Sequence, residues 1–348
     1  MTHLPFGLRN ATAAFSRTMT HVLSGVENVL AYVDDILVYT KSPDVSDHLK
    51  TLRSVFERFR LFDLKLSPKK CKFAIDSMDF LGYTVSPKGY TPSLSRIEII
   101  KNLSAPTTLK QVRRIVGMAS FYRKHILGFA TIVEPLTRLN KKNKAFEWGK
   151  DQMNAFQKIK DLLSEEPILT FPDYTSPFHI FTDASGVGHG AALMQKREEK
   201  FSAIAYASRS LSANERKWPP VQIELGAIIY ALRIFRPYIY LSEVELHSDH
   251  RPLAYLQSKS HQHPQLARWL IEIQNYNIKI VHIEGKKNTL ADALSRAHNS
   301  ENDDTSELED IIEFPVCLSL SIYDRTIHDP VLNTLILEPA MEKHSRLT

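Results

Sequence analysis

The sequence predicts a multidomain protein of the α+β and α/β classes, and three observations support this fold class. The chain has 348 residues, which is enough for two or three domains. Its apolar fraction of 43% and charged fraction of 24% are ordinary for a globular protein and exclude a wholly disordered or collagen-like chain. The hydrophobic pattern also changes along the chain, from mixed strands and helices to helices alone, and then, from residue 176, to short strands alternating with helices.

The first part of the chain is expected to begin with a short helix over residues 11–24. Residues 28–40 (NVLAYVDDILVYT) place two β-rich arms around Asp34 and Asp35, which indicates a tight hairpin. Asp47 is expected to cap an amphipathic helix over residues 48–62. The pattern then predicts a strand at 80–85 with a turn at 86–89, and three helices at 96–103, 108–121 and 151–163.

From residue 176 the pattern predicts one mixed sheet covered by helices. The expected strands are 178–183, 190–195, 202–207, 244–247 and 278–283, and the expected helices are 221–235, 263–276 and 289–297. Strands and helices in this order are typical of a layered α/β domain. Residues 300–313 hold seven acidic and no basic residues and are expected to be a solvated linker, and residues 314–348 are too short for a further domain.

Charge is distributed unevenly along the chain. Residues 1–150 contain 24 Lys and Arg against 12 Asp and Glu, whereas residues 300–348 contain 3 against 11. A strongly basic half favours a polyanionic partner, because Lys and Arg that neutralise phosphates release condensed counterions. Nucleic acid is therefore the leading candidate, and a merely solvated basic surface explains the charge equally well.

Two classes of protein are excluded by what the sequence does not contain. No apolar run approaches the roughly 20 residues that a membrane span requires, and the first ten residues carry no secretory signal pattern. Cys71 and Cys317 are too few for a disulfide framework or a cysteine-rich zinc module, and both are expected to be reduced. We therefore expect a cytoplasmic or nuclear protein that is not secreted and has no membrane partner.

Four acidic residues after residue 176 lie at positions where burying a charged carboxylate would cost free energy, or where a carboxylate could bind a cation. Asp183 ends an apolar strand, Glu224 lies beside the apolar stripe of a helix, Asp249 follows a strand, and Asp292 lies in the first turn of the last helix. Each has a structural alternative: a turn at 183, an ion pair of Glu224 with Arg233 or a strand lysine, a helix cap at 249, and a capping box at 289–292. Together they can converge on two Mg²⁺ ions roughly 4 Å apart, an arrangement that hydrolyses phosphodiesters.

Four segments carry a specific resemblance: residues 181–185 (FTDAS), 223–225 (IEL), 247–253 (HSDHRPL) and 288–296 (NTLADALSR). In order and approximate spacing they resemble the ribonuclease H domain of gypsy-type LTR retrotransposon Pol polyproteins. The resemblance implies that Asp183, Glu224, Asp249 and Asp292 hold two Mg²⁺ or Mn²⁺ ions and cut the RNA strand of RNA–DNA hybrids. In one departure from bacterial ribonucleases H, the loop at 284–287 (EGKK) contains no histidine.

The first part resembles the reverse transcriptase of the same polyproteins. The matching segments are 4–10 (LPFGLRN), 32–35 (YVDD), 80–83 (FLGY), 112–123 (VRRIVGMASFYR) and 146–148 (FEW). The resemblance implies that Asp34 and Asp35 bind metal in the polymerase hairpin, that Phe6 and Gly7 lie near the incoming nucleotide, and that Gly82 and Tyr83 grip the primer end. The leading contacts to template–primer nucleic acid are expected to be Arg113, Arg114, Arg123 and Lys124.

The resemblance implies a further essential Asp upstream of the Asp34–Asp35 hairpin. Residues 1–33 contain no Asp and only one acidic residue, Glu27, so this part of a polymerase site is absent from the sequence. The expected organisation is a partial reverse transcriptase palm at 1–90, thumb and connection helices at 91–175, a ribonuclease H-like domain at 176–298, and an acidic linker with a truncated tail at 299–348. Ribonuclease H activity is expected of this chain and polymerase activity only of the parent polyprotein. Two alternatives remain open: a non-catalytic nucleic-acid-binding remnant, and a fragment that exposes unpaired sheet edge and does not fold fully.

Overall fold

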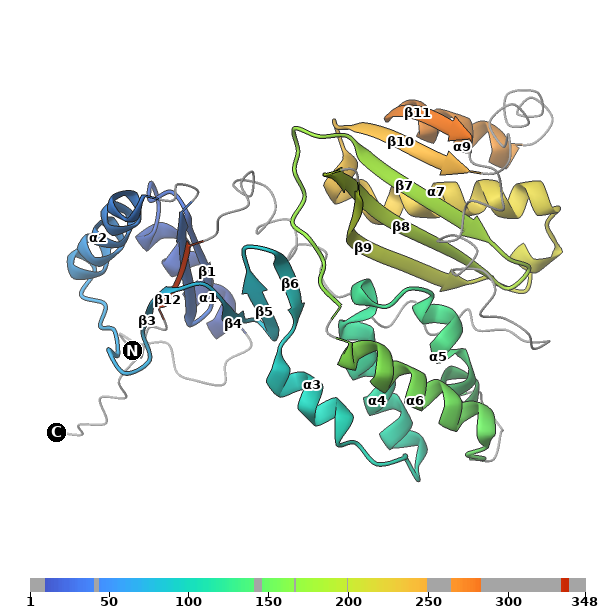
Figure 1. Cartoon of the computed structure of the whole chain (residues 1–348), viewed down its shortest axis with the longest axis horizontal. Coiled ribbons are helices and arrows are strands. Elements are labelled where there is room, and N and C mark those ends of the chain that lie inside the picture. The colour runs from blue at the N-terminus through green and yellow to red at the C-terminus, as the bar shows by residue number, and fades with distance from the viewer. Residues whose placement is uncertain are drawn as a thin grey trace. The chain divides into compact units, whose positions relative to one another are not determined.

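The computed structural model describes residues 10–40, 44–140, 146–165, 167–198, 200–248, 264–282 and 333–337. The chain divides into two compact units, which we describe separately (Figure 1). The first unit comprises Met1–Gly89 with Ser321–Thr348, and the second comprises Tyr90–Leu320. Among the described residues, no helix combines the length and the apolar character needed to cross a membrane.

The first unit is built on a four-stranded sheet with the order β1-β2-β12-β3. Its elements are α1 (Ala11–Val22), β1 (Val29–Tyr32), β2 (Asp35–Thr40), α2 (Val45–Leu61), β3 (Lys72–Ile75) and β12 (Asn333–Leu337). The core is apolar and joins both helices to the hairpin, with Met19 of α1, Ile36 of β2 and Val55 of α2 each at most 1% exposed. The hairpin expected at 28–40 is confirmed.

Two expectations for the first unit need correction. Asp44, and not Asp47, is the N-cap of α2, because its carboxylate accepts a hydrogen bond from the Ser46 amide at 2.8 Å. Strand β12, in a region where no element was expected, pairs antiparallel with both β2 and β3. A strand of five residues carries too little periodicity to be recognised without knowledge of its partners.

The expected strand at 80–85 is interrupted by a turn and belongs to two strands. β4 (Met78–Phe80) and β5 (Tyr83–Ser86) form a hairpin in which Phe80 pairs with Tyr83. Leu81 and Gly82 form its two-residue turn, and their φ angles of 51° and 85° match the left-handed conformation that such tight hairpins favour. β6 (Gly89–Pro92) follows at the boundary between the units.

The second unit begins with a helical segment. It contains α3 (Leu94–Lys101), α4 (Leu109–Phe121), the 3₁₀ turn η1 (Arg123–His125), α5 (Phe129–Thr137), η2 (Arg138–Asn140) and α6 (Lys150–Ser164). Three of these helices were expected and α5 was not. Gly128, with a φ of 67°, precedes α5, and Pro135 lies inside it, so the sequence presents two residues that normally interrupt helices.

A mixed five-stranded sheet forms the rest of the second unit, with the order β11-β10-β7-β8-β9. The strands are β7 (Phe178–Ala184), β8 (Gly188–Arg197), β9 (Lys200–Ser210), β10 (Glu243–Ser248) and β11 (Asn277–His282). β10 runs parallel to β7 and β11, while β8 is antiparallel to β7 and β9. Helices α7 (Pro220–Ile239) and α9 (Pro264–Gln274) contact each other, and α7 packs against β7 and β8 (Figure 1).

The predicted mixed sheet with helices is thus confirmed. The helix expected at 289–297 and the linker at 300–313 lie outside the described residues.

Candidate functional site

Asp183 lies near the end of strand β7 and pairs with Gly190 of β8. The strand forms because Phe178, Ile180 and Phe181 are buried apolar residues, and Asp183 interrupts this run with a half-buried carboxyl group. Its Oδ2 atom is shielded from solvent. Because Asp183 is within a paired strand, the structure does not support the alternative that it belongs to a strand-ending turn.

Glu224 lies in the second turn of α7, a helix that begins at Pro220 with proline in a favoured position. Its neighbours Ile223 and Leu225 are buried, and the Oε2 atom of Glu224 is also shielded from solvent. Arg233, one suggested partner, instead forms two hydrogen bonds of 2.7 Å with Glu272. The structure therefore gives Glu272, and not Glu224, as the acidic partner of Arg233.

Asp249 and Asp292 lie outside the described residues. The structure does define the strand that leads to Asp249. β10 ends at Ser248 and runs parallel to β7, with His247 paired to Phe181, two residues before Asp183. The strand therefore ends beside the part of β7 that carries Asp183.

Asp183 and Glu224 fit a hard divalent cation in their chemistry. Each offers a buried carboxylate oxygen, and they come from β7 and α7, two elements that pack together. Carboxylate oxygens are the ligands that Mg²⁺ prefers. This pair is the part of the expected four-acid site that the structure describes.

The Asp34–Asp35 pair lies at the tip of the hairpin in the first unit. Tyr32 pairs with Asp35, so Val33 and Asp34 form the two-residue turn. Asp34 is exposed and Asp35 half-buried. Val33 has a φ of 53°, a strained conformation for a β-branched residue that is typical of functional turns.

Of the other residues expected in the polymerase part, Phe6 and Gly7 lie outside the described residues. Gly82 occupies the second position of the turn between β4 and β5, and Tyr83 opens β5. Both are half-buried.

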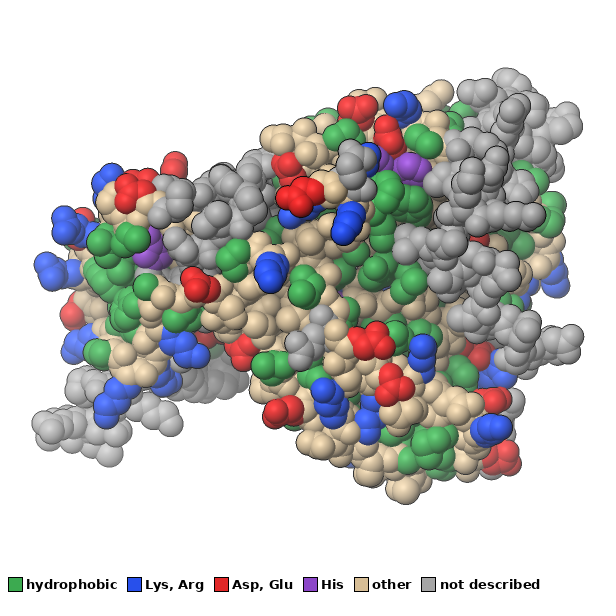
Figure 2. Space-filling view, viewed as in Figure 1, with side chains coloured by type: hydrophobic (Ala, Val, Ile, Leu, Met, Phe, Trp, Pro, Cys, Tyr) green, Lys and Arg blue, Asp and Glu red, His purple; other side chains and the backbone are tan. Residues whose placement is uncertain are grey.

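The four basic residues expected to contact nucleic acid differ in their surroundings. Arg113 and Arg114 are exposed on α4, and Arg113 donates to Asn140 Oδ1 at 3.0 Å. Arg123 donates to the Ser208 carbonyl at 2.8 Å, and Lys124 donates to the Tyr238 hydroxyl at 3.3 Å. On the face seen in Figure 2, basic side chains around the helical segment are interspersed with acidic ones. Through these two hydrogen bonds Arg123 and Lys124 also link η1 to the five-stranded sheet and to α7.

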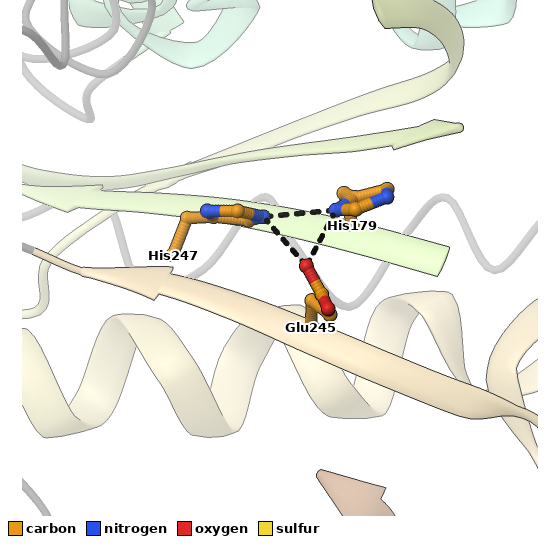
Figure 3. Close-up of side chains that lie close together, drawn as sticks. All are labelled: His179, Glu245 and His247. Carbon is orange, nitrogen blue, oxygen red and sulfur yellow. Dashed lines mark hydrogen bonds and ion pairs between the residues drawn. The ribbon is translucent and has the colours of Figure 1, made fainter. Parts of the chain in front are cut away.

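A cluster that the sequence analysis missed lies on strands β7 and β10 and consists of His179, Glu245 and His247 (Figure 3). His179 Nδ1 is 2.9 Å from His247 Nε2 and 3.4 Å from Glu245 Oε2, and the last two atoms are 4.0 Å apart. The signal that could have found it is the alternation of Glu245 and His247 on one strand, which directs both to the same face.

Two parts of the chain are similar to known protein families. Residues 1–85 match the family described as reverse transcriptase (RNA-dependent DNA polymerase), and residues 173–276 match the RNase H-like domain found in reverse transcriptase. The Pol polyprotein from transposon 412 of Drosophila melanogaster is 38% identical over 297 residues, which are 85% of this chain and 24% of the relative. For transposon gypsy of the same organism the identity is 33%, covering 84% of this chain and 29% of the relative.

The chain thus spans about a quarter of the length of the curated relatives it matches. Among solved structures, a foamy viral protease–reverse transcriptase in complex with double-stranded DNA aligns with a TM-score of 0.72 at 24% identity, covering 81% of this chain and 50% of that one. The corresponding complex with an RNA/DNA hybrid gives 0.71 at 23% identity, covering 88% and 42%. These likenesses confirm the expected fold class.

Proposed function

Because the chain belongs to the retrovirus-related Pol polyproteins of transposons and contains reverse transcriptase and RNase H-like parts, we propose that its second part is a metal-dependent ribonuclease H. Its substrate would be the RNA strand of an RNA–DNA hybrid, met in the cytoplasm or nucleus. The observation that carries this proposal is the pair of buried carboxylate oxygens that Asp183 and Glu224 present from neighbouring elements.

We assign the full site to Asp183, Glu224, Asp249 and Asp292, which would hold two Mg²⁺ or Mn²⁺ ions. The pairing of His247 with Phe181 supports the inclusion of Asp249, because Asp249 lies two positions after His247 and Asp183 lies two positions after Phe181. Bound ions of this type activate water and stabilise the leaving oxygen. The protein's own contribution is to fix the carboxylates on a paired strand and a packed helix, so that the ligands need little reorganisation when the ions bind.

For the first part we propose a reverse transcriptase palm whose hairpin presents Asp34 and Asp35 to metal. RNA-directed DNA polymerase activity is then a property of the parent polyprotein. The 348-residue chain alone would not extend a primer, because residues 1–33 supply no further Asp to complete the metal site and position the nucleotide. Incorporation of deoxynucleotides on a template–primer by this chain would contradict the proposal.

The proposed domain boundaries are the palm at 1–90, thumb and connection helices at 91–175, ribonuclease H at 176–298, and the linker and tail at 299–348. The change from helices to the five-stranded sheet between α6 and β7 supports the central boundary.

The test uses the purified chain with a labelled RNA–DNA hybrid, a DNA duplex of the same sequence and the single-stranded RNA. We expect cleavage of RNA only in the hybrid, with Mg²⁺ or Mn²⁺ present, and no cleavage in EDTA. Cleavage that survives chelation would refute a metal-dependent mechanism. Binding of the hybrid without cleavage would identify the chain as a non-catalytic nucleic-acid-binding remnant.

A further inference from the structure

We propose that His179, Glu245 and His247 form a second cation site, selective for a borderline divalent ion such as Zn²⁺, which joins strands β7 and β10. The three ligand atoms are His179 Nδ1, His247 Nε2 and Glu245 Oε2, and Figure 3 shows their side chains pointing toward one another. None of the three residues belongs to the proposed nuclease site, so each proposal can be tested independently of the other.

The separations of the ligand atoms match a tetrahedral site. Zinc bonds of 2.0–2.2 Å at tetrahedral angles place neighbouring ligand atoms about 3.3 Å apart. The observed separations are 2.9, 3.4 and 4.0 Å, which bracket this value. Small side-chain rotations would therefore bring all three atoms to bonding distance from one ion, with the fourth position open to water.

The protonation of the two histidines is compatible with a bound cation. His179 Nδ1 and His247 Nε2 share one hydrogen bond, so one nitrogen carries a proton and the other does not. Two nitrogens and one carboxylate oxygen therefore face a common point with a single proton between the nitrogens. When an ion binds, the imidazole that donates this hydrogen bond would move its proton to its other ring nitrogen, so that both nitrogens and the carboxylate oxygen each offer a lone pair to the ion. Neutral imidazole is the usual ligand form of histidine.

Neighbouring side chains hold the cluster in place. Lys279 donates to Glu245 Oε1 at 3.2 Å, which leaves Oε2 directed toward the histidines. The His247 ring stacks on Phe181 with 4.4 Å between centroids, and Phe201 packs edge-on against His179 at 5.0 Å. Such outer contacts orient metal ligands and are typical of functional metal sites.

The donor set distinguishes this site from the nuclease carboxylates. Two imidazoles and one carboxylate suit Zn²⁺, whereas Mg²⁺ takes oxygen ligands and retains several waters. A bound ion would cross-link β7, which carries Asp183, to β10, which leads to Asp249. At about 3.3 Å per strand residue, His179 lies roughly 13 Å along β7 from Asp183, and His247 lies beside Phe181, which is roughly 7 Å from Asp183. The role of the ion would therefore be to brace the two strands.

The test titrates the full chain with Zn²⁺, and with Co²⁺ as a spectroscopic substitute, in excess Mg²⁺ that occupies hard-oxygen sites. We expect one equivalent to bind, an intense visible absorption from tetrahedral Co²⁺, and a higher melting temperature with Zn²⁺. His179→Gln and His247→Gln should each weaken binding at least tenfold and abolish the Zn²⁺-dependent increase in melting temperature.

Two matched variants serve as controls. Glu243→Gln removes an exposed carboxylate from the same strand, and Asp183→Asn changes the proposed nuclease site; both should bind Zn²⁺ as the wild type does. Melting of each histidine variant without metal checks that it folds. Failure of the wild type to bind Zn²⁺, or undiminished binding by the folded histidine variants, would show that the cluster is only a hydrogen-bonded triad.

Discussion

The guanidinium of Arg123 donates a hydrogen bond to the backbone carbonyl of Ser208, with 2.8 Å between Nη2 and the oxygen. Arg123 belongs to η1 and Ser208 to β9, an edge strand of the five-stranded sheet. The Ser208 hydroxyl in turn accepts a hydrogen bond from the Ala130 amide at 2.9 Å. Ser208 thus connects the helical segment to the sheet through two hydrogen bonds, one to its carbonyl and one to its hydroxyl.

Replacing Arg123 with Ala should therefore lower the free energy of unfolding. The loss of a charged hydrogen bond and of the contact with the Phe129 ring is expected to cost about 1–3 kcal/mol. Urea denaturation followed by circular dichroism measures this change. Arg114→Ala, at an exposed position on α4, is the control and should change stability by less than about 0.5 kcal/mol. Equal stability of the two variants would argue against a structural role for Arg123.

Nucleic-acid binding should depend on Arg114 in a salt-sensitive way. If its exposed guanidinium neutralises one phosphate, Arg114→Ala should weaken binding to a hybrid duplex and reduce the slope of log affinity against log salt by about 1. Fluorescence anisotropy at several salt concentrations gives both quantities. An unchanged slope would remove Arg114 from the binding surface. Lys110→Ala, one turn earlier on the same helix, tests whether neighbouring charges contribute equally.

Acid should destabilise the second unit through His125. Burial lowers the pKa of this histidine to about 4, partly offset by its hydrogen bond to the Pro167 carbonyl. Between pH 6.5 and about 4 the unfolded chain takes up a proton that the folded chain does not, so stability falls as the pH falls, by about 1.4 kcal/mol per pH unit. Above pH 6.5 this contribution is fully present.

The measurement compares urea unfolding of the wild type and His125→Asn at pH 7 and pH 5. The variant should be less stable at pH 7 but should lose less stability on acidification. The difference between the two proteins isolates His125 from the other buried histidines. Parallel pH dependences would contradict the assignment.

Gly226 of α7 should tolerate no side chain. A Cβ atom there would lie 2.8 Å from Cε1 and 3.1 Å from Nε2 of His189, a buried residue on β8. Ala normally stabilises a helix by about 1 kcal/mol relative to Gly, but overpacking costs about 1–3 kcal/mol. We expect Gly226→Ala to lower the melting temperature and Gly117→Ala, in α4 with open space around it, to raise it. A stabilised Gly226→Ala protein would show that His189 can move aside.

The sequence predicted the sheet domain well because its signals are local. The strand Phe178–Ala184 and the helix Pro220–Ile239 each have an apolar pattern of a single period. Their type was therefore predicted correctly, and only their end residues differ from the expected ones. Elements that depend on distant partners were missed. β12 exists through pairing with β2 and β3, and α5 forms despite Pro135.

The same distinction applies to the sites. Asp183 and Glu224 could be proposed from the sequence because an acid in an apolar run is conspicuous, and their role stays a prediction. The His179–Glu245–His247 cluster was missed because His179 lies 68 positions before His247, and the two strands meet only through the parallel pairing of β7 with β10. The internal roles of Arg123 and Lys124 were missed for a similar reason, since charge alone does not distinguish a phosphate contact from a contact with a carbonyl or a tyrosine.

The most direct test of the account is the initial rate of RNA cleavage in a labelled RNA–DNA hybrid with Mg²⁺, for the wild type and Asp183→Asn. Asn keeps the shape of Asp and removes the charge that holds the cation, so we expect the rate to fall by orders of magnitude while the melting temperature stays equal or rises slightly. Asp151→Asn, at an exposed position on α6, should cleave at the wild-type rate, and Asp44→Ala, which removes a true helix cap, should lose about 1 kcal/mol of stability. Equal cleavage by the wild type and Asp183→Asn would contradict the central claim.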